Sequence, residues 1–283
     1  MSTVLLQQYF AHIGTDGNLK PHKNLLLFEY LLLCSLEIKK GFLFDIARPN
    51  LKQVQSAIVA SGKKSLMIVK LCDDIIVISS EYLHRKLQNM WDTKYIDDSI
   101  IVKINHESLQ ICTTEEVGLL VEIILRVFVE FYRGYAEYCA CNLEVPTVVS
   151  VAEEHRYFFP FLAGWLIGYP CIYTQMEMNS SFDNLSMVTL RKLAIQARLN
   201  SGFRPSNKFN TGTSDKDMSN SQLLDILVFT VPSLLYEDHQ VRIDELVSAR
   251  LRELQSLTNR YFGSADLQLT FTTECITAPV VSL

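Results

Sequence analysis

The stretch SLMIVKLCDDIIVIS, residues 65–79, decides the fold of this chain more than any other segment. Two runs rich in β-branched residues flank Cys72-Asp73-Asp74, and this central composition is typical of a tight turn. The stretch therefore predicts two strands that pair as a β-hairpin.

Further helices and strands are predicted on both sides of this hairpin. Before it, we expect a buried leucine-rich helix at 25–38, a short strand from Gly41 and a helix at 51–61. After it, Ser79 or Ser80 can cap a helix at 81–90, and a strand follows at 99–105.

The second half of the chain continues this alternation. Thr113-Thr-Glu-Glu has the form of a capping box and predicts the start of one long helix that extends to Glu137. Beyond Pro146 the patterns predict, in chain order, a helix around 153–166, strands at 169–174, 187–199 and 226–231, a helix at 241–257 and an alternating last strand at 267–277.

This order of elements predicts the fold class. We expect an α/β or α+β protein, with a mixed β-sheet of about seven or eight strands, one β-hairpin among them, and helices packed against the sheet. A chain of 283 residues can form a single globular domain, spanning 1–283. Residues 201–221, which are rich in Ser, Asn, Thr, Asp and Gly, predict a mobile polar loop within that domain.

Composition and charge exclude several classes of protein. The chain is 48% hydrophobic and 20% charged, which is typical of a globular protein and not of a disordered or fibrous one. A net charge of −5 without a basic block argues against nucleic-acid binding, unless Lys39, Lys40, Lys63 and Lys64 cluster in space.

The same sequence predicts an intracellular location, cytoplasmic or nuclear. Residues 1–14 lack the basic region of a signal peptide, and proline and glycine divide the apolar stretch 158–173, so we expect no transmembrane helix. The seven cysteines lie mostly in apolar runs, as free thiols do in a reducing compartment.

Three segments resemble one known family. Residues 163–173, AGWLIGYPCIY, resemble its GWLLGYPVVY-like segment, residues 184–191 resemble its NSLALTPLR-like stretch, and residues 269–283 resemble its C-terminal STE…VAL ending. This is the uncharacterised eukaryotic chromosome 1 open reading frame seventy-four family, a family of unknown function. The resemblance implies an intracellular eukaryotic α/β protein and carries over no activity.

Polar residues at predicted strand ends give the first catalytic candidates. Asp45 follows the first strand, and Asn105 and His106 follow the strand at 99–105. Asp45 and His106 would face one crevice if their strands are neighbours, and His106 could then act as a general base. Alternatively, Asp45 stabilises the turn at Arg48-Pro49 and His106 is a solvated loop residue.

The most distinctive cluster lies at a predicted helix-to-strand corner, where glycines alternate with aromatic residues. In one interpretation Gly164 permits close packing, Gly168 ends the helix in a left-handed conformation and Trp165 fills the core. In the other, Trp165, Tyr169 and Tyr173 belong to a pocket in which a flat or glycosidic ligand stacks.

Glu274, on the last strand, is a third catalytic candidate. If its carboxylate points inward, it needs a polar partner or a raised pKa. If it points outward, it belongs to the solvent-exposed face of the strand. Near the end of the chain, Val281-Ser-Leu283 either packs on the sheet edge or binds a PDZ-like groove.

No cofactor or metal is expected. Cys139, Cys141 and His155 offer three ligands, whereas a closed zinc site needs four. The P-loop, dinucleotide, zincin and hydrolase-elbow motifs are missing from the sequence.

Two hypotheses of function follow. The lack of a catalytic signature favours a non-enzymatic interaction or scaffold module with a protein partner, without nucleic acid or membrane. The alternative is an enzyme or a small-molecule-binding protein with a pocket near Asp45, His106 and Tyr173.

Overall fold

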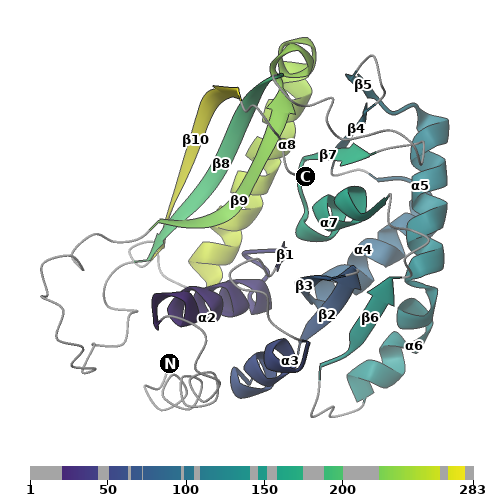
Figure 1. Cartoon of the computed structure of the whole chain (residues 1–283), viewed down its shortest axis with the longest axis vertical. Coiled ribbons are helices and arrows are strands. Elements are labelled where there is room, and N and C mark those ends of the chain that lie inside the picture. Colours follow the sequence, from purple (N-terminus) through teal and green to yellow (C-terminus); the bar gives the residue numbers. More distant parts are fainter. Residues whose placement is uncertain are drawn as a thin grey trace, which may run out of the picture.

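The computed structural model describes residues 21–43, 51–62, 65–71, 73–96, 99–104, 109–140, 146–151, 158–174, 188–199, 223–261 and 267–277. The described residues form seven helices and ten strands, which confirms the predicted α/β class (Figure 1). The strands divide over three sheets, in the orders β1-β3-β2-β6, β10-β8-β9 and β5-β4-β7, and not over one mixed sheet. Periodicity locates strands, but pairing between distant strands depends on tertiary packing.

The predicted hairpin is confirmed and lies at the centre of the four-stranded sheet. Strand β2 (Leu66–Leu71) pairs antiparallel with β3 (Asp74–Ser79), β1 (Gly41–Leu43) pairs with β3, and β6 (Val148–Val151) runs parallel to β2. Strand β6 was not predicted.

Both faces of this hairpin are buried by helices. Met67, Val69 and Ile76 pack on the side of α4 (Ser80–Thr93), α5 (Thr114–Val127), α6 (Val129–Ala140) and α7 (Phe159–Ile167). Ile68 and Val77 pack on the side of α2 (Pro21–Ser35) and α3 (Leu51–Ala60). Burial of each such side chain contributes about 1.5–3 kcal/mol, so this three-layer unit holds much of the core.

The other two sheets lie beyond this unit (Figure 1). Strand β4 (Ile100–Ile104) pairs antiparallel with β5 (Leu109–Ile111), which was not predicted, and parallel with β7 (Cys171–Thr174). Strands β8 (Thr189–Leu199), β9 (Leu223–Pro232) and β10 (Leu267–Thr277) form an antiparallel sheet that packs against α8 (Ser233–Tyr261). The predicted bounds of the last strand are those observed.

Helix termini follow the predicted capping residues. The Ser79 hydroxyl accepts a hydrogen bond from the Tyr82 amide at the start of α4, and Thr113 and Glu116 form both hydrogen bonds of a capping box at the start of α5. Gly168 ends α7 with a φ of 82°, a left-handed conformation that glycine adopts without steric cost.

Two helix predictions need correction, and a third is tested only in part. The helix predicted from Thr113 to Glu137 is two helices, since the backbone at Phe128 is not helical and its ring is buried against Trp165. The helix predicted around 153–166 is confirmed over Phe159–Ile167, and residues 152–157 lie outside the described residues. The helix predicted at 241–257 extends over Ser233–Tyr261, with non-helical backbone angles at His239.

Among the described helices, none has the length and apolar character that a membrane crossing requires. The loop predicted at 201–221 lies outside the described residues.

Candidate functional site

Several predicted site residues fall outside the described part of the chain. These are Asp45, Asn105, His106, Cys141, His155 and residues 281–283, and the side chain of Cys139 is likewise not described. The strands that precede Asp45 and His106 belong to different sheets, since β1 pairs with β3 and β4 pairs with β5 and β7. Within the described ranges, no group of three or more His, Cys, Asp or Glu side chains forms a metal site.

The corner at 164–173 is tightly packed. A Cβ atom on Gly164 would lie 3.0 Å from Ile172 Cγ2 and 3.5 Å from Tyr169 Cδ2, so this position allows α7 to approach β7 closely. Trp165 is fully buried, and its ring centroid lies 6.0 Å from that of Phe128. The Tyr173 hydroxyl donates a hydrogen bond of 3.0 Å to the Thr230 carbonyl of β9.

Glu274 lies on the exposed surface of β10. Its carboxylate accepts a hydrogen bond of 2.7 Å from the Lys192 ammonium on the neighbouring strand. This is a solvent-exposed ion pair, which contributes little to stability.

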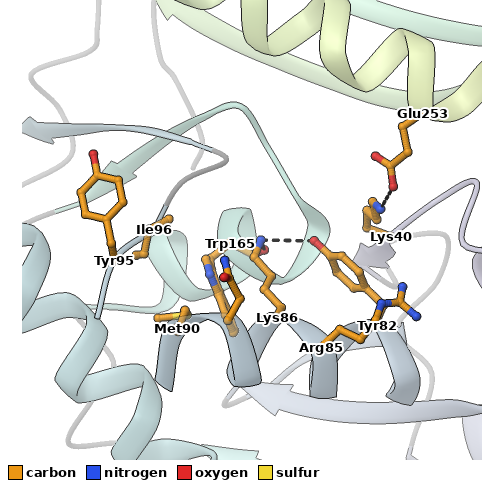
Figure 2. A pocket seen from close by; sticks show the side chains of 10 residues that line it. Lys40, Tyr82, Arg85, Lys86, Met90, Tyr95, Ile96, Trp165 and Glu253 are labelled. Atoms are coloured by element: carbon orange, nitrogen blue, oxygen red, sulfur yellow. Dashed lines mark hydrogen bonds and ion pairs between the residues drawn. The ribbon is translucent and has the colours of Figure 1, made fainter. Parts of the chain in front are cut away.

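A pocket of about 280 Å³ lies where α4, the end of α7, residue 40 and α8 meet, and we call it the lysine pocket (Figure 2). Its lining combines cationic, aromatic, apolar and polar side chains: Lys40, Tyr82, Arg85, Lys86, Asn89, Met90, Tyr95, Ile96, Trp165 and Glu253. Of the site candidates that the structure describes, Trp165 lines the pocket, whereas Tyr169, Tyr173 and Glu274 do not.

Two lysine side chains face one tyrosine ring in this pocket. Figure 2 shows Tyr82 between Lys86 and Lys40, and the two Nζ atoms lie 5.5 Å and 4.7 Å from the centroid of its ring. The Lys86 ammonium also donates hydrogen bonds to the Tyr82 hydroxyl at 3.2 Å and to the Trp165 carbonyl at 2.9 Å. Both ammonium groups are thus held at the pocket by the same aromatic side chain.

The Lys40 side chain is only 11% exposed, and its environment disfavours its charge. Burial lowers the pKa of Lys40 to about 8, and the positive charge of Arg250 acts in the same direction. The Glu253 carboxylate opposes this shift by forming an ion pair with Lys40. Burial alone would raise the pKa of Glu253, but Arg250 and Lys40 together hold it below its usual value.

Arg85 adds a third positive charge at the exposed rim. It forms ion pairs with Glu37 and with Glu81, the latter at 3.1 Å. Burial tends to lower the pKa of Arg85, but the hydrogen bond and charge of Glu37 raise it, so the guanidinium stays charged. The lining therefore carries three cationic side chains and one carboxylate, Glu253.

This arrangement suits an anion. Ammonium and guanidinium groups donate strong hydrogen bonds to phosphate and carboxylate oxygens. An additional negative charge beside Lys40 would favour its protonated form, which burial disfavours. Hence the pocket offers charge and donors to a small anion.

Sequence analysis missed most of these residues because they come from distant parts of the chain. The spacing of Tyr82 and Lys86 on the predicted helix 81–90 does place them on one face. The sequence indicates Lys39 and Lys40 only as members of a possible basic cluster. Lys39 is in fact buried and donates hydrogen bonds to the Asp225 and Ile226 carbonyls, while Lys63 and Lys64 lie outside the described residues.

Gly168 lies against two lining residues of the pocket, Lys40 and Tyr82, and its replacement gives a first test. In Gly168→Ala the new Cβ would lie 3.1 Å from Lys40 Cγ and 3.2 Å from the Tyr82 hydroxyl oxygen, at a φ of +82°. We expect the free energy of unfolding to fall by about 2 kcal/mol, of which the left-handed backbone accounts for about half.

Gly62→Ala is the matched control, since Gly62 has a φ of +67° and nothing within 4 Å of the added Cβ. Urea denaturation of both variants separates backbone strain from crowding. Equal losses in the two variants would mean that Lys40 and Tyr82 move aside without cost.

Comparison with known protein families finds a match over most of the chain. A family described as a domain of unknown function (DUF4504) matches residues 11–283. Neither the curated proteins nor the solved structures include a match to the chain.

Proposed function

Since the chain belongs to this family of unknown function, we propose from the geometry of the described residues that it binds a small anion in the lysine pocket. The observation that carries the proposal is the pair of lysines on Tyr82. Two ammonium groups that face one ring present positive charge to the pocket, and with Arg85 they outnumber the single carboxylate of its lining, Glu253, so a bound anion would balance this charge.

The size and lining of the pocket narrow the class of ligand. A volume of about 280 Å³ is at the lower end for small-molecule sites, which suits a compact phosphorylated or carboxylated metabolite. Met90, Ile96 and Trp165 are buried directly beneath the other lining residues, so the floor of the pocket is apolar and suits the carbon part of such a ligand. The proposal takes up the small-molecule alternative, at a place other than Asp45 and His106.

The first test is the binding of sulfate, phosphate and citrate, measured by thermal shift and by isothermal titration calorimetry. A ligand that binds only the native state at about 100 times its Kd stabilises that state by about 2.7 kcal/mol. In Lys86→Met we expect affinity to fall about tenfold or more, because a charge-assisted hydrogen bond contributes about 1.5–3 kcal/mol.

Lys94→Met is the matched control, since the Lys94 ammonium also lies over an aromatic ring, 4.4 Å from the centroid of Trp91, but outside the pocket. Sulfate keeps its charge at neutral and alkaline pH, so its affinity should fall as the pH rises through about 8 and Lys40 loses its proton. No shift with any anion, or equal losses in the two variants, would contradict the proposal.

We also infer that this family is the chromosome 1 open reading frame seventy-four family. The three segments that resemble the latter, at 163–173, 184–191 and 269–283, all fall within the matched range. An intracellular location remains part of the proposal. The free thiols of Cys34, Cys112 and Cys171 support it, and burial raises the pKa of each to about 12, so that they stay protonated.

The interaction-module hypothesis is compatible with ligand binding. The surface that would bind a protein partner is distinct from the lysine pocket. The lining residues of the pocket gather around α4 and α7, whereas the exposed strand β10 forms one edge of the β10-β8-β9 sheet (Figure 1).

A further inference from the structure

Strand β10 forms the edge of its sheet over its full length. It pairs with β8 through eleven consecutive residues, Leu267–Thr277, without a register shift, and no described strand pairs with its other side. Figure 1 shows it at the outer margin of the sheet. The N–H and C=O groups that alternate along this margin can accept another strand.

Edge strands usually carry features that prevent pairing with another chain, and β10 has few of these features. Its sequence, LQLTFTTECIT, contains no lysine, proline or glycine, and its pairing with β8 contains no β-bulge. Edge strands that stay unpaired are typically short, bulged or charged. The single charged residue, Glu274, is already paired with Lys192 of the neighbouring strand.

One aromatic side chain at this edge is incompletely covered. Phe271 lies opposite Ile195, which belongs to the core cluster with Val247 and Leu254 of α8, so its ring is on the core side of the sheet. It is nevertheless 39% exposed. A neighbouring strand with its own apolar face would complete this side of the core.

We propose that β10 pairs antiparallel with β10 of a second copy of this chain, giving a dimer with a continuous six-stranded sheet. A two-fold axis through Thr272, the central residue of the strand, pairs all eleven residues. Phe271 then lies opposite Thr273 of the second copy and diagonal to the second Phe271, within reach of an aromatic contact.

Charge also favours self-pairing. In this register Glu274 lies opposite Thr270 of the second copy, so no two like charges meet along the strands. In the self-paired sheet Leu269 and Phe271 of each strand lie on the core side, and Thr270 and Thr272 lie on the solvent side.

The test uses two lysine substitutions of opposite expected effect. Thr272→Lys places two ammonium groups opposite each other on the two-fold axis, whereas Thr270→Lys places an ammonium group opposite Glu274 of the second copy. Both threonines are exposed, so either variant should keep the folded monomer, which a thermal melt checks.

Sedimentation equilibrium of the full chain then measures the dimer dissociation constant. We expect a dimer for the unmodified chain, a dissociation constant at least about tenfold higher for Thr272→Lys, and an equal or lower one for Thr270→Lys. A monomeric unmodified chain, as when another segment or another protein covers the edge, would overturn the proposal. A dimer that responds equally to both substitutions would overturn it as well.

Discussion

Replacement of Trp165 by alanine is expected to lower the free energy of unfolding by about 3–5 kcal/mol, because it opens a cavity in the largest core cluster. The side chain is fully buried, packs on Phe128 and lies 4.9 Å from the Lys86 ammonium. Its indole Nε1 is buried without a hydrogen-bond partner in the described structure, which reduces the loss toward the lower end.

The chain has one other tryptophan, Trp91, which serves as the matched control. Trp91 is 43% exposed and stacks on Tyr132 at the surface, so Trp91→Ala should cost about 1 kcal/mol. Chemical denaturation with circular dichroism as the probe measures both variants on the same scale. If Trp165→Ala costs no more than Trp91→Ala, Trp165 does not anchor the core.

The second large effect is expected for Arg250→Met. Arg250 is 8% exposed, and it donates a hydrogen bond of 2.9 Å to the Ile38 carbonyl while it forms an ion pair with Glu253. Its removal leaves the carbonyl of a fully buried residue without its donor and deprives Glu253 of one of its two cations. We expect the free energy of unfolding to fall by about 2–4 kcal/mol.

Arg252→Met tests whether this loss comes from the contacts or merely from the lost charge. Arg252 is exposed on the same helix, and a substitution there should change stability by less than about 0.5 kcal/mol. Arg250→Lys adds a second control, since lysine keeps the charge but lacks the two arms that reach Ile38 and Glu253 together. Stability of Arg250→Lys equal to that of the unmodified chain would show that charge alone matters.

Local signals in the sequence predicted much of the fold. The hairpin at 65–79, the last strand, the capping box at Thr113 and the helix end at Gly168 all depend on interactions between near neighbours in the chain. Such interactions leave a pattern in a short window of sequence.

Features that depend on tertiary contacts were not predicted. Strand β6 is a four-residue strand that forms because its backbone pairs with β2, and the helix break at Phe128 coincides with the packing of its ring on Trp165. The division into three sheets depends on which strands pair across long separations in sequence. A single sequence does not contain this information in any local window.

The same reasoning explains why the sequence predicted only one residue of the candidate site. Trp165 was predicted from a distinctive local cluster, but the lysine pocket unites it with Lys40, Tyr82, Lys86 and Glu253 from three other parts of the chain. None of these has an unusual neighbourhood in sequence. Their significance comes from distances in the folded chain, such as the two amines on one tyrosine ring.

The contacts of residues 38–40 have a consequence for how the protein is made. The Ile38 carbonyl, Lys39 and Lys40 find their polar partners in Arg250, in the Asp225 and Ile226 carbonyls and in Glu253. A ribosome that adds about 5–20 residues per second needs roughly 10–40 s to translate the chain from residues 38–40 to these partners at residues 225–253. During that time the nascent N-terminal region cannot complete its core. Chains halted before about residue 253 should therefore depend on chaperones, and final closure of the fold should follow release of the last helix from the ribosome.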